Sequence, residues 1–126
     1  MNLQLPLKTK WFEMTKAGIK TEDYRKINSY WFKRLVFDYE KVCSYYNINS
    51  YNDIEIMTIC SDCFWSKTIA FKPFDTNTMT LGYPKKGDKE RTLVFEHAGI
   101  EIRTGNPEWG AEPDKLYFVI KHGKLL

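Results

Sequence analysis

The sequence predicts an α+β domain in which a small β-barrel packs against one or two helices. Several short segments alternate between hydrophobic and polar residues, as strands do, and turn-forming residues separate them. Two segments near the N-terminus instead carry hydrophobic residues at helical spacing. The 126 residues, 43% of them hydrophobic, contain no evident repeat or linker, so we expect one domain with one core.

The N-terminal segment predicts a strand followed by a helix. Residues 3–8 alternate, and Pro6 indicates an edge position or a strand end because it lacks a backbone donor. Thr9 is a candidate N-cap for a helix that runs to about Ala17, and Gly18 is placed to end it with a positive φ. The predicted buried residues of this helix are Trp11 and Met14, with Phe12 as a further candidate.

A second strand and a longer helix are expected next. Residues 21–27 predict a strand with Thr21, Asp23 and Arg25 on one face. Hydrophobic residues at helical spacing then predict a single helix over residues 29–45, capped by Ser29.

The remainder of the chain predicts mainly strands and turns. The expected strands are residues 53–59, 68–72, 74–81, 91–103 and 115–121, with Gly99 as a bulge or bend. The expected turns and loops are residues 47–52, 60–67, 84–88 and 104–114.

The net charge of +3 is uneven along the chain. Residues 1–36 carry +5 and residues 67–92 carry +3, whereas residues 37–66 carry −4. The two basic segments could form one surface for phosphate, or an ordinary mixed surface. The sequence shows no membrane-spanning hydrophobic run and no signal peptide, so we expect a cytoplasmic protein.

The octapeptide Gly18-Ile19-Lys20-Thr21-Glu22-Asp23-Tyr24-Arg25 is the most informative motif. Its pattern, Gly-x-Lys-x-x-Asp-x-Arg between a first helix and a second strand, resembles the opening of the ASCH family. Residues 30–35, 74–83 and 105–110 also resemble small bacterial and phage members, so the resemblance covers residues 3–36 and 74–124. Residues 37–73 then read as an insertion in a single ASCH-like domain.

The resemblance implies a PUA-like barrel flanked by two helices and an RNA- or nucleotide-related role. Lys20 and Arg25 would contact phosphate or base edges, and Trp109 or Tyr83 would stack on a base. Each residue also has a structural interpretation. Arg25 could pair with Asp23 on the same strand face, and the rings could pack against the barrel.

The alternative is a small hydrolase, since some family members resemble amidohydrolases that remove acyl groups from modified cytidine. Those members carry a Thr three residues after the Lys, where this chain has Asp23. Candidate catalytic residues are Lys20, Thr21, Asp23 and Glu108, with the carboxylate of Asp23 activating water. Glu108 could equally be a solvated loop residue.

No cofactor is predicted, because no phosphate-binding or dinucleotide fingerprint is present. Cys60 and Cys63 have zinc-ligand spacing, with Cys43 and a histidine, His97 or His122, as possible further ligands. The usual second Cys pair is missing, so we expect reduced thiols and no metal. A third functional possibility is that residues 37–73 bind another protein.

Overall fold

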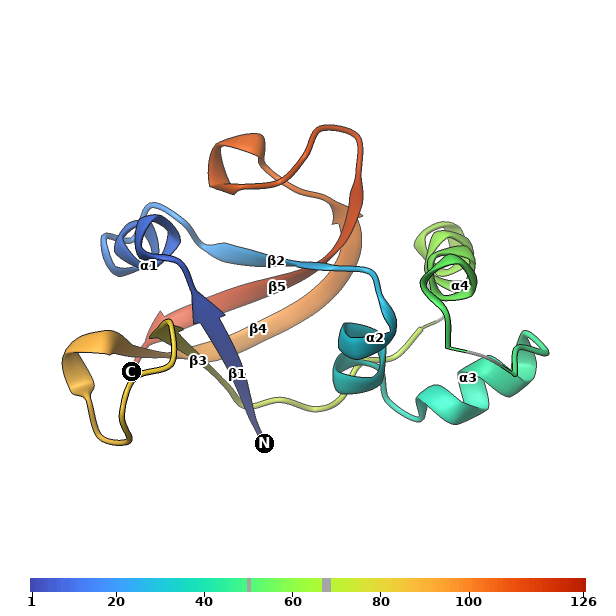
Figure 1. Ribbon diagram of the computed structural model, residues 1–126, viewed down its shortest axis with the longest axis horizontal. Helices are drawn as coiled ribbons and strands as arrows, with labels where there is room; N and C mark the ends of the chain where they lie inside the picture. Colours follow the sequence, from blue (N-terminus) through green and yellow to red (C-terminus); the bar gives the residue numbers. More distant parts are fainter. Residues whose placement is uncertain (50, 67–68) are drawn as a thin grey trace.

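The computed structural model describes residues 1–49, 51–66 and 69–126. Its five strands form one curled, half-barrel sheet in the order β1-β3-β4-β5-β2 (Figure 1). β1 runs parallel to β3, and the other neighbours are antiparallel. The strands are β1 (Asn2–Leu7), β2 (Glu22–Lys26), β3 (Thr76–Leu81), β4 (Thr92–Thr104) and β5 (Leu116–Leu125). The expected α+β class is confirmed, with the sheet open between its edge strands β1 and β2.

The described residues form four α-helices, two more than the sequence predicts. These are α1 (Thr9–Lys16), α2 (Ser29–Leu35), α3 (Tyr39–Tyr45) and α4 (Asp53–Ser66), and two short 3₁₀ helices are η1 (Lys89–Arg91) and η2 (Pro107–Trp109). α1 lies at one end of the sheet, and α3 and α4 lie together at the other (Figure 1). We call α3 and α4 the helical arm. No helix in the described ranges is long and hydrophobic enough to cross a membrane.

The N-terminal elements follow the prediction closely. Pro6 lies in an edge strand, and Gly18 follows α1 with φ 77°. Two details differ. Lys8, not Thr9, is the N-cap of α1, and the buried side of the helix is Phe12 and Thr15, with Trp11 only partly buried. Phe12 joins the core beneath the sheet, which leaves Trp11 at the side of the helix.

The predicted helix over residues 29–45 is wrong as a single element. Asn28 caps α2, accepting a hydrogen bond from the Trp31 N–H, and the helix stops at Leu35 because Val36 is extended and pairs with Phe71. Asp38, with φ 51°, then redirects the chain into α3. The pairing of Val36 with a distant segment therefore overrides a continuous helical pattern.

The predicted strand 53–59 and the first part of the predicted loop 60–67 are also wrong, because residues 53–66 form α4. The Asn52 side chain accepts from the Glu55 N–H at 2.9 Å, as an N-cap does. Ile56, Ile59, Cys60 and Cys63 are buried at spacings of three and four residues, the period of a helix. Residues 67 and 68 lie outside the described ranges. Residues 69–72 form only the single bridge at Phe71 rather than a strand.

The C-terminal half matches the expected strands and turns. Asp88 N–H donates to Lys85 O at 3.1 Å in the predicted turn. The register of β4 against β5 is irregular on both sides of His97, and Gly99 has φ 112° there, as a bulge requires. β5 continues to Leu125, beyond the predicted end at residue 121.

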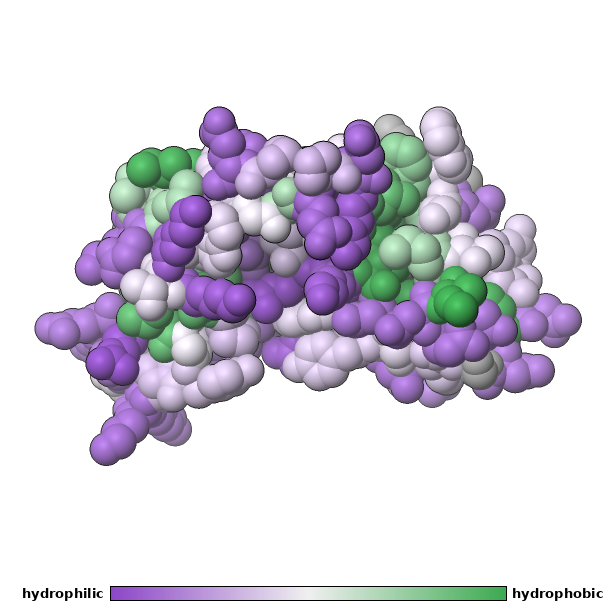
Figure 2. Space-filling view, turned by 45° about the horizontal axis from the view of Figure 1, so that its top comes forward, coloured by the Kyte–Doolittle hydropathy of each residue, from purple (hydrophilic) through white to green (hydrophobic). Residues whose placement is uncertain are grey.

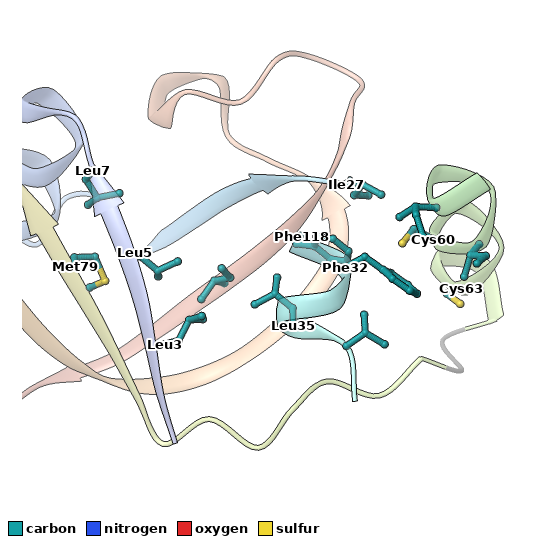
Figure 3. Close-up of a cluster of buried hydrophobic side chains, with 14 of the residues drawn as sticks. Leu3, Leu5, Leu7, Ile27, Phe32, Leu35, Cys60, Cys63, Met79 and Phe118 are labelled. Atoms are coloured by element: carbon teal, nitrogen blue, oxygen red, sulfur yellow. The ribbon is translucent and has the colours of Figure 1, made fainter. Parts of the chain in front are cut away.

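One hydrophobic core joins the sheet to the helical arm. Leu5 of β1 and Phe118 of β5 are fully buried on the concave side of the sheet. Phe32 of α2 and Cys60 of α4 continue the same cluster away from the sheet (Figure 3). The arm is therefore anchored through α4.

Phe118→Ala should lower the free energy of unfolding by about 3–5 kcal/mol, because it leaves a cavity in the fully buried centre of this core. Urea denaturation measures the loss. Leu126→Ala, at an exposed position, is the control and should change stability by less than about 0.5 kcal/mol. Equal effects of the two substitutions would contradict the packing described here.

Candidate functional site

Gly18 places the motif by ending α1 in a tight turn. Its positive φ is readily adopted only by glycine, and the backbone N–H groups of Ile19 and Lys20 both donate to Met14 O. This turn directs the Lys20 side chain inward immediately before β2 begins.

Lys20, Asp23 and Arg25 form a buried ionic cluster. Lys20 is 2% exposed and Asp23 is 5% exposed. Lys20 Nζ donates to Asp23 Oδ1 at 2.9 Å, and Arg25 Nε and Nη2 donate to Asp23 Oδ2 at 3.0 and 2.8 Å. Lys20 Nζ also donates to Glu22 O at 2.6 Å. One carboxylate therefore compensates a buried cation, Lys20, and a partly buried one, Arg25.

Asp23 is an ionised anchor in this arrangement. Burial alone would raise the pKa of its carboxyl, but Arg25 and Lys20 together hold that pKa below its ordinary value. Both of its oxygens already accept hydrogen bonds from these cations. A carboxylate held in this way is poorly suited to take a proton from water.

Arg25 connects the two edge strands of the sheet, β2 and β1. Its Nη2 donates to Pro6 O of β1 at 2.9 Å, and its guanidinium lies 4.9 Å from the Trp31 ring centroid. The hydrogen bond from Arg25 to Pro6 O bridges the opening between β1 and β2. These contacts support the ion-pair interpretation of Arg25.

A pocket of about 220 Å³ opens beside the cluster. Trp11, Trp109 and Gly110 are among its lining residues, and Gly110 packs against the Trp11 ring. Lys20, Asp23, Tyr24 and Tyr117 also line it, and Lys26, Glu112 and Lys115 complete the lining. Lys20 Nζ donates two hydrogen bonds to the described residues and lies 5.6 Å from the centroid of the Tyr24 ring.

The loop that carries Trp109 is fastened to the sheet. Asn106 N–H donates to Tyr24 Oη, and Glu112 N–H donates to Tyr117 Oη, both at 2.9 Å. A Cβ on Gly110 would lie 2.8 Å from the Trp11 ring, so this close approach requires glycine. The walls of the pocket are consequently preformed.

The structure brings Lys20, Asp23 and Trp109 together, but not every residue that the sequence singles out. Thr21 and Glu108 are exposed and do not line the pocket. Tyr83, 92% exposed, lies in the loop between β3 and β4, also outside the pocket.

Sequence reasoning missed several lining residues. The sequence predicts Trp11 on the core side of α1. It indicates no role for Lys26, Glu112 or Lys115. The only available signals were the proximity of Lys26 to the motif and of Glu112 and Lys115 to Trp109 along the chain. Their convergence depends on how the loop folds over β2.

A chain of hydrogen bonds, His122–Asn77–His97, crosses the concave face. Asn77 Nδ2 donates to Lys121 O at 3.1 Å, which fixes the orientation of the amide. The same group lies 2.9 Å from His122 Nδ1, which must accept, while Asn77 Oδ1 lies 2.7 Å from His97 Nδ1. His122 is therefore neutral, with its proton on a buried Nε2 that has no partner among the described residues. Burial lowers its pKa to about 4.

The three cysteines are buried, and no disulfide joins them. Cys43 lies in α3 and Cys60 and Cys63 lie in α4, whereas His97 and His122 bond to Asn77 within the sheet. Within the described part of the chain, no group of three or more possible metal ligands is found.

Comparison with family models, with curated proteins and with solved structures finds no match.

Asp23→Asn should lower the free energy of unfolding by about 3–5 kcal/mol, because it leaves the buried Lys20 and the partly buried Arg25 without their counter-charge. Urea denaturation at neutral pH measures this. Asp114→Asn, an exposed position whose left-handed backbone asparagine tolerates, is the matched control and should be nearly neutral. A small loss for Asp23→Asn would show that the cluster does not stabilise the fold.

Stability should also fall as the pH drops from about 6.5 to about 4. In this range the unfolded chain protonates His122, but the folded protein does not, because the folded pKa is lowered. His122→Leu should show a shallower decline in chemical denaturation across this range. Asp23 contributes to a separate loss below about pH 4, where the unfolded chain protonates this carboxyl but the folded protein, in which its pKa is lowered, does not. An unchanged pH dependence in His122→Leu would contradict the assignment.

Proposed function

We propose that this protein is an RNA- or nucleotide-binding domain with an ASCH-type, PUA-like barrel, and that the ligand occupies the pocket beside Lys20. The observation that carries the proposal is that a buried lysine, Lys20, and two tryptophans, Trp11 and Trp109, line one pocket. The motif Gly18-x-Lys20-x-x-Asp23-x-Arg25 lies at this point, which adds the family resemblance to the physical argument.

The chemistry of the pocket suits a base with an attached phosphate. Trp11 and Trp109 both line the pocket, and stacking on an aromatic side chain contributes about 1–3 kcal/mol per base. The third N–H of Lys20 would donate to a base oxygen or a phosphate. Lys26 and Lys115 add cationic groups at the pocket, where Glu112 pairs with Lys115 at 3.4 Å.

The volume favours one nucleotide unit within the pocket. About 220 Å³ is below the range of about 300–1,000 Å³ that is usual for drug-sized ligands. A longer strand would therefore place one base in the pocket and its neighbours on the surface. Affinity should fall with salt in proportion to the number of phosphates contacted.

The hydrolase alternative draws on one observation, the position of Lys20 in a pocket of nucleoside size. Binding is better supported because Asp23 is fully engaged by Lys20 and Arg25. Thr21 and Glu108, the other candidate catalytic residues, do not line the pocket. Mass spectrometry after incubation with N-acylated cytidines distinguishes the two functions, because only a hydrolase forms the deacylated product.

Trp109→Ala should weaken the binding of a fluorescein-labelled single-stranded RNA octamer by about 5- to 150-fold, the range that corresponds to the loss of one stacked base. Fluorescence anisotropy at several salt concentrations measures the affinity. Trp65→Ala is the matched control, because Trp65 is an exposed tryptophan on α4, away from the pocket.

In a separate variant, Lys26→Gln should reduce the slope of log affinity against log salt concentration by about 1, the value for the loss of one phosphate contact. Absence of RNA and nucleotide binding by the native chain, or equal losses in Trp109→Ala and Trp65→Ala, would refute the proposal.

A further inference from the structure

The helical arm and its flanks expose large hydrophobic side chains to an unusual degree. Tyr45 is 83% exposed, Ile54 81%, Trp65 83% and Phe37 57%. Exposed hydrophobic side chains that gather in one patch are typical of sites that contact another molecule. Figure 2 shows hydrophobic residues at this end of the molecule and others at the opposite end.

A groove of about 570 Å³ runs between α3 and α4. Val42 and Tyr45 of α3 line it together with Tyr46, the C-cap of α3, and Cys63 of α4 also lines it. A second groove of about 370 Å³ shares Cys63 and Ile69 with it and continues toward β4. Both lie away from the pocket beside Lys20.

The groove follows one face of α3 and its two caps. Asp38, Lys41, Val42, Tyr45 and Tyr46 all line it, at spacings of three and four residues. Such a stripe normally packs against a neighbouring helix, with side-chain ridges fitting into grooves. Tyr46 Oη already donates to Asp62 of α4, so a helix would lie over the groove and cover Tyr45, the exposed member of the stripe.

Charge decides which kind of helix fits. Residues 37–66 carry a net charge of −4, whereas the whole chain carries +3. Face-to-face contact between the arms of two copies would bring these negative charges together, which disfavours a symmetric dimer. A basic helix instead places its cations near Asp38 at the groove and near the other carboxylates of the arm.

We propose that the groove between α3 and α4 binds a basic amphipathic helix of another protein. The hydrophobic face of that helix packs on Val42, Tyr45 and Tyr46, and its lysines or arginines lie toward the acidic arm. This interaction is independent of RNA or nucleotide binding at the pocket beside Lys20.

The test uses the full chain and a labelled synthetic helix of about 18 residues, with leucines at helical spacing and lysines elsewhere. Two control peptides are a scrambled sequence of the same composition, which has no hydrophobic face, and a version with glutamate in place of lysine. Fluorescence anisotropy measures each affinity, and sedimentation velocity measures self-association of the protein.

Tyr45→Ala should weaken binding of the leucine–lysine helix by about tenfold or more, as loss of an interface tyrosine does. Ile54→Ala is the matched control, because Ile54 is equally exposed but lies outside both grooves, and it should leave affinity unchanged. Asp38→Asn should weaken binding about twofold or threefold at low salt and have no effect at about 1 M salt, where charges are screened.

Equal binding of the scrambled or the glutamate peptide would overturn the proposal. So would equal effects of Tyr45→Ala and Ile54→Ala, or the absence of peptide binding. Self-association that Tyr45→Ala abolishes would also overturn it, because the groove would then be occupied by a second copy.

Discussion

The burial of Asp23 between Lys20 and Arg25 is the constraint on which the rest of the site depends. Two cations and one carboxylate are stable away from water only if their hydrogen bonds are nearly complete, and here both carboxylate oxygens are occupied. The turn at Gly18 places Lys20 beside Asp23. Arg25 extends the cluster to Pro6 on the opposite edge of the sheet. The same contacts thus connect the two edge strands and hold Lys20 among the residues that line the pocket.

Much of the fold could be predicted where local sequence determines local structure. The edge position implied by Pro6, the helix end at Gly18 and the irregularity at Gly99 follow from backbone chemistry alone. The break at Val36 could not be predicted, because its cause is a partner 35 residues away, Phe71. The sequence does not predict α4, because residues 53–59 also alternate weakly, as a strand does. The capping of this helix by Asn52 becomes clear only in three dimensions.

In the candidate site, too, some features follow from local sequence and others depend on tertiary packing. The motif identified Lys20 and Asp23, which are close in sequence and remain close in the fold. The contact of Arg25 with β1 and the position of Trp11 opposite Trp109 depend on tertiary packing, so the sequence alone left their roles open. One core nevertheless connects this site to the helical arm, so a pocket lined by lysines and an acidic, hydrophobic groove are held at separate places on one scaffold (Figures 1 and 3).

The central claim is that a buried Lys20 ammonium group meets the ligand, and NMR of the lysine Nζ groups tests it most directly. A buried, hydrogen-bonded ammonium exchanges its protons slowly, so Lys20 should give a ¹H–¹⁵N signal that exposed lysines lack. Lys20→Met identifies that signal by its loss. Addition of cytidine monophosphate should shift it if the account is right. A signal that is absent, or one that saturating nucleotide or RNA leaves unchanged, would contradict the account.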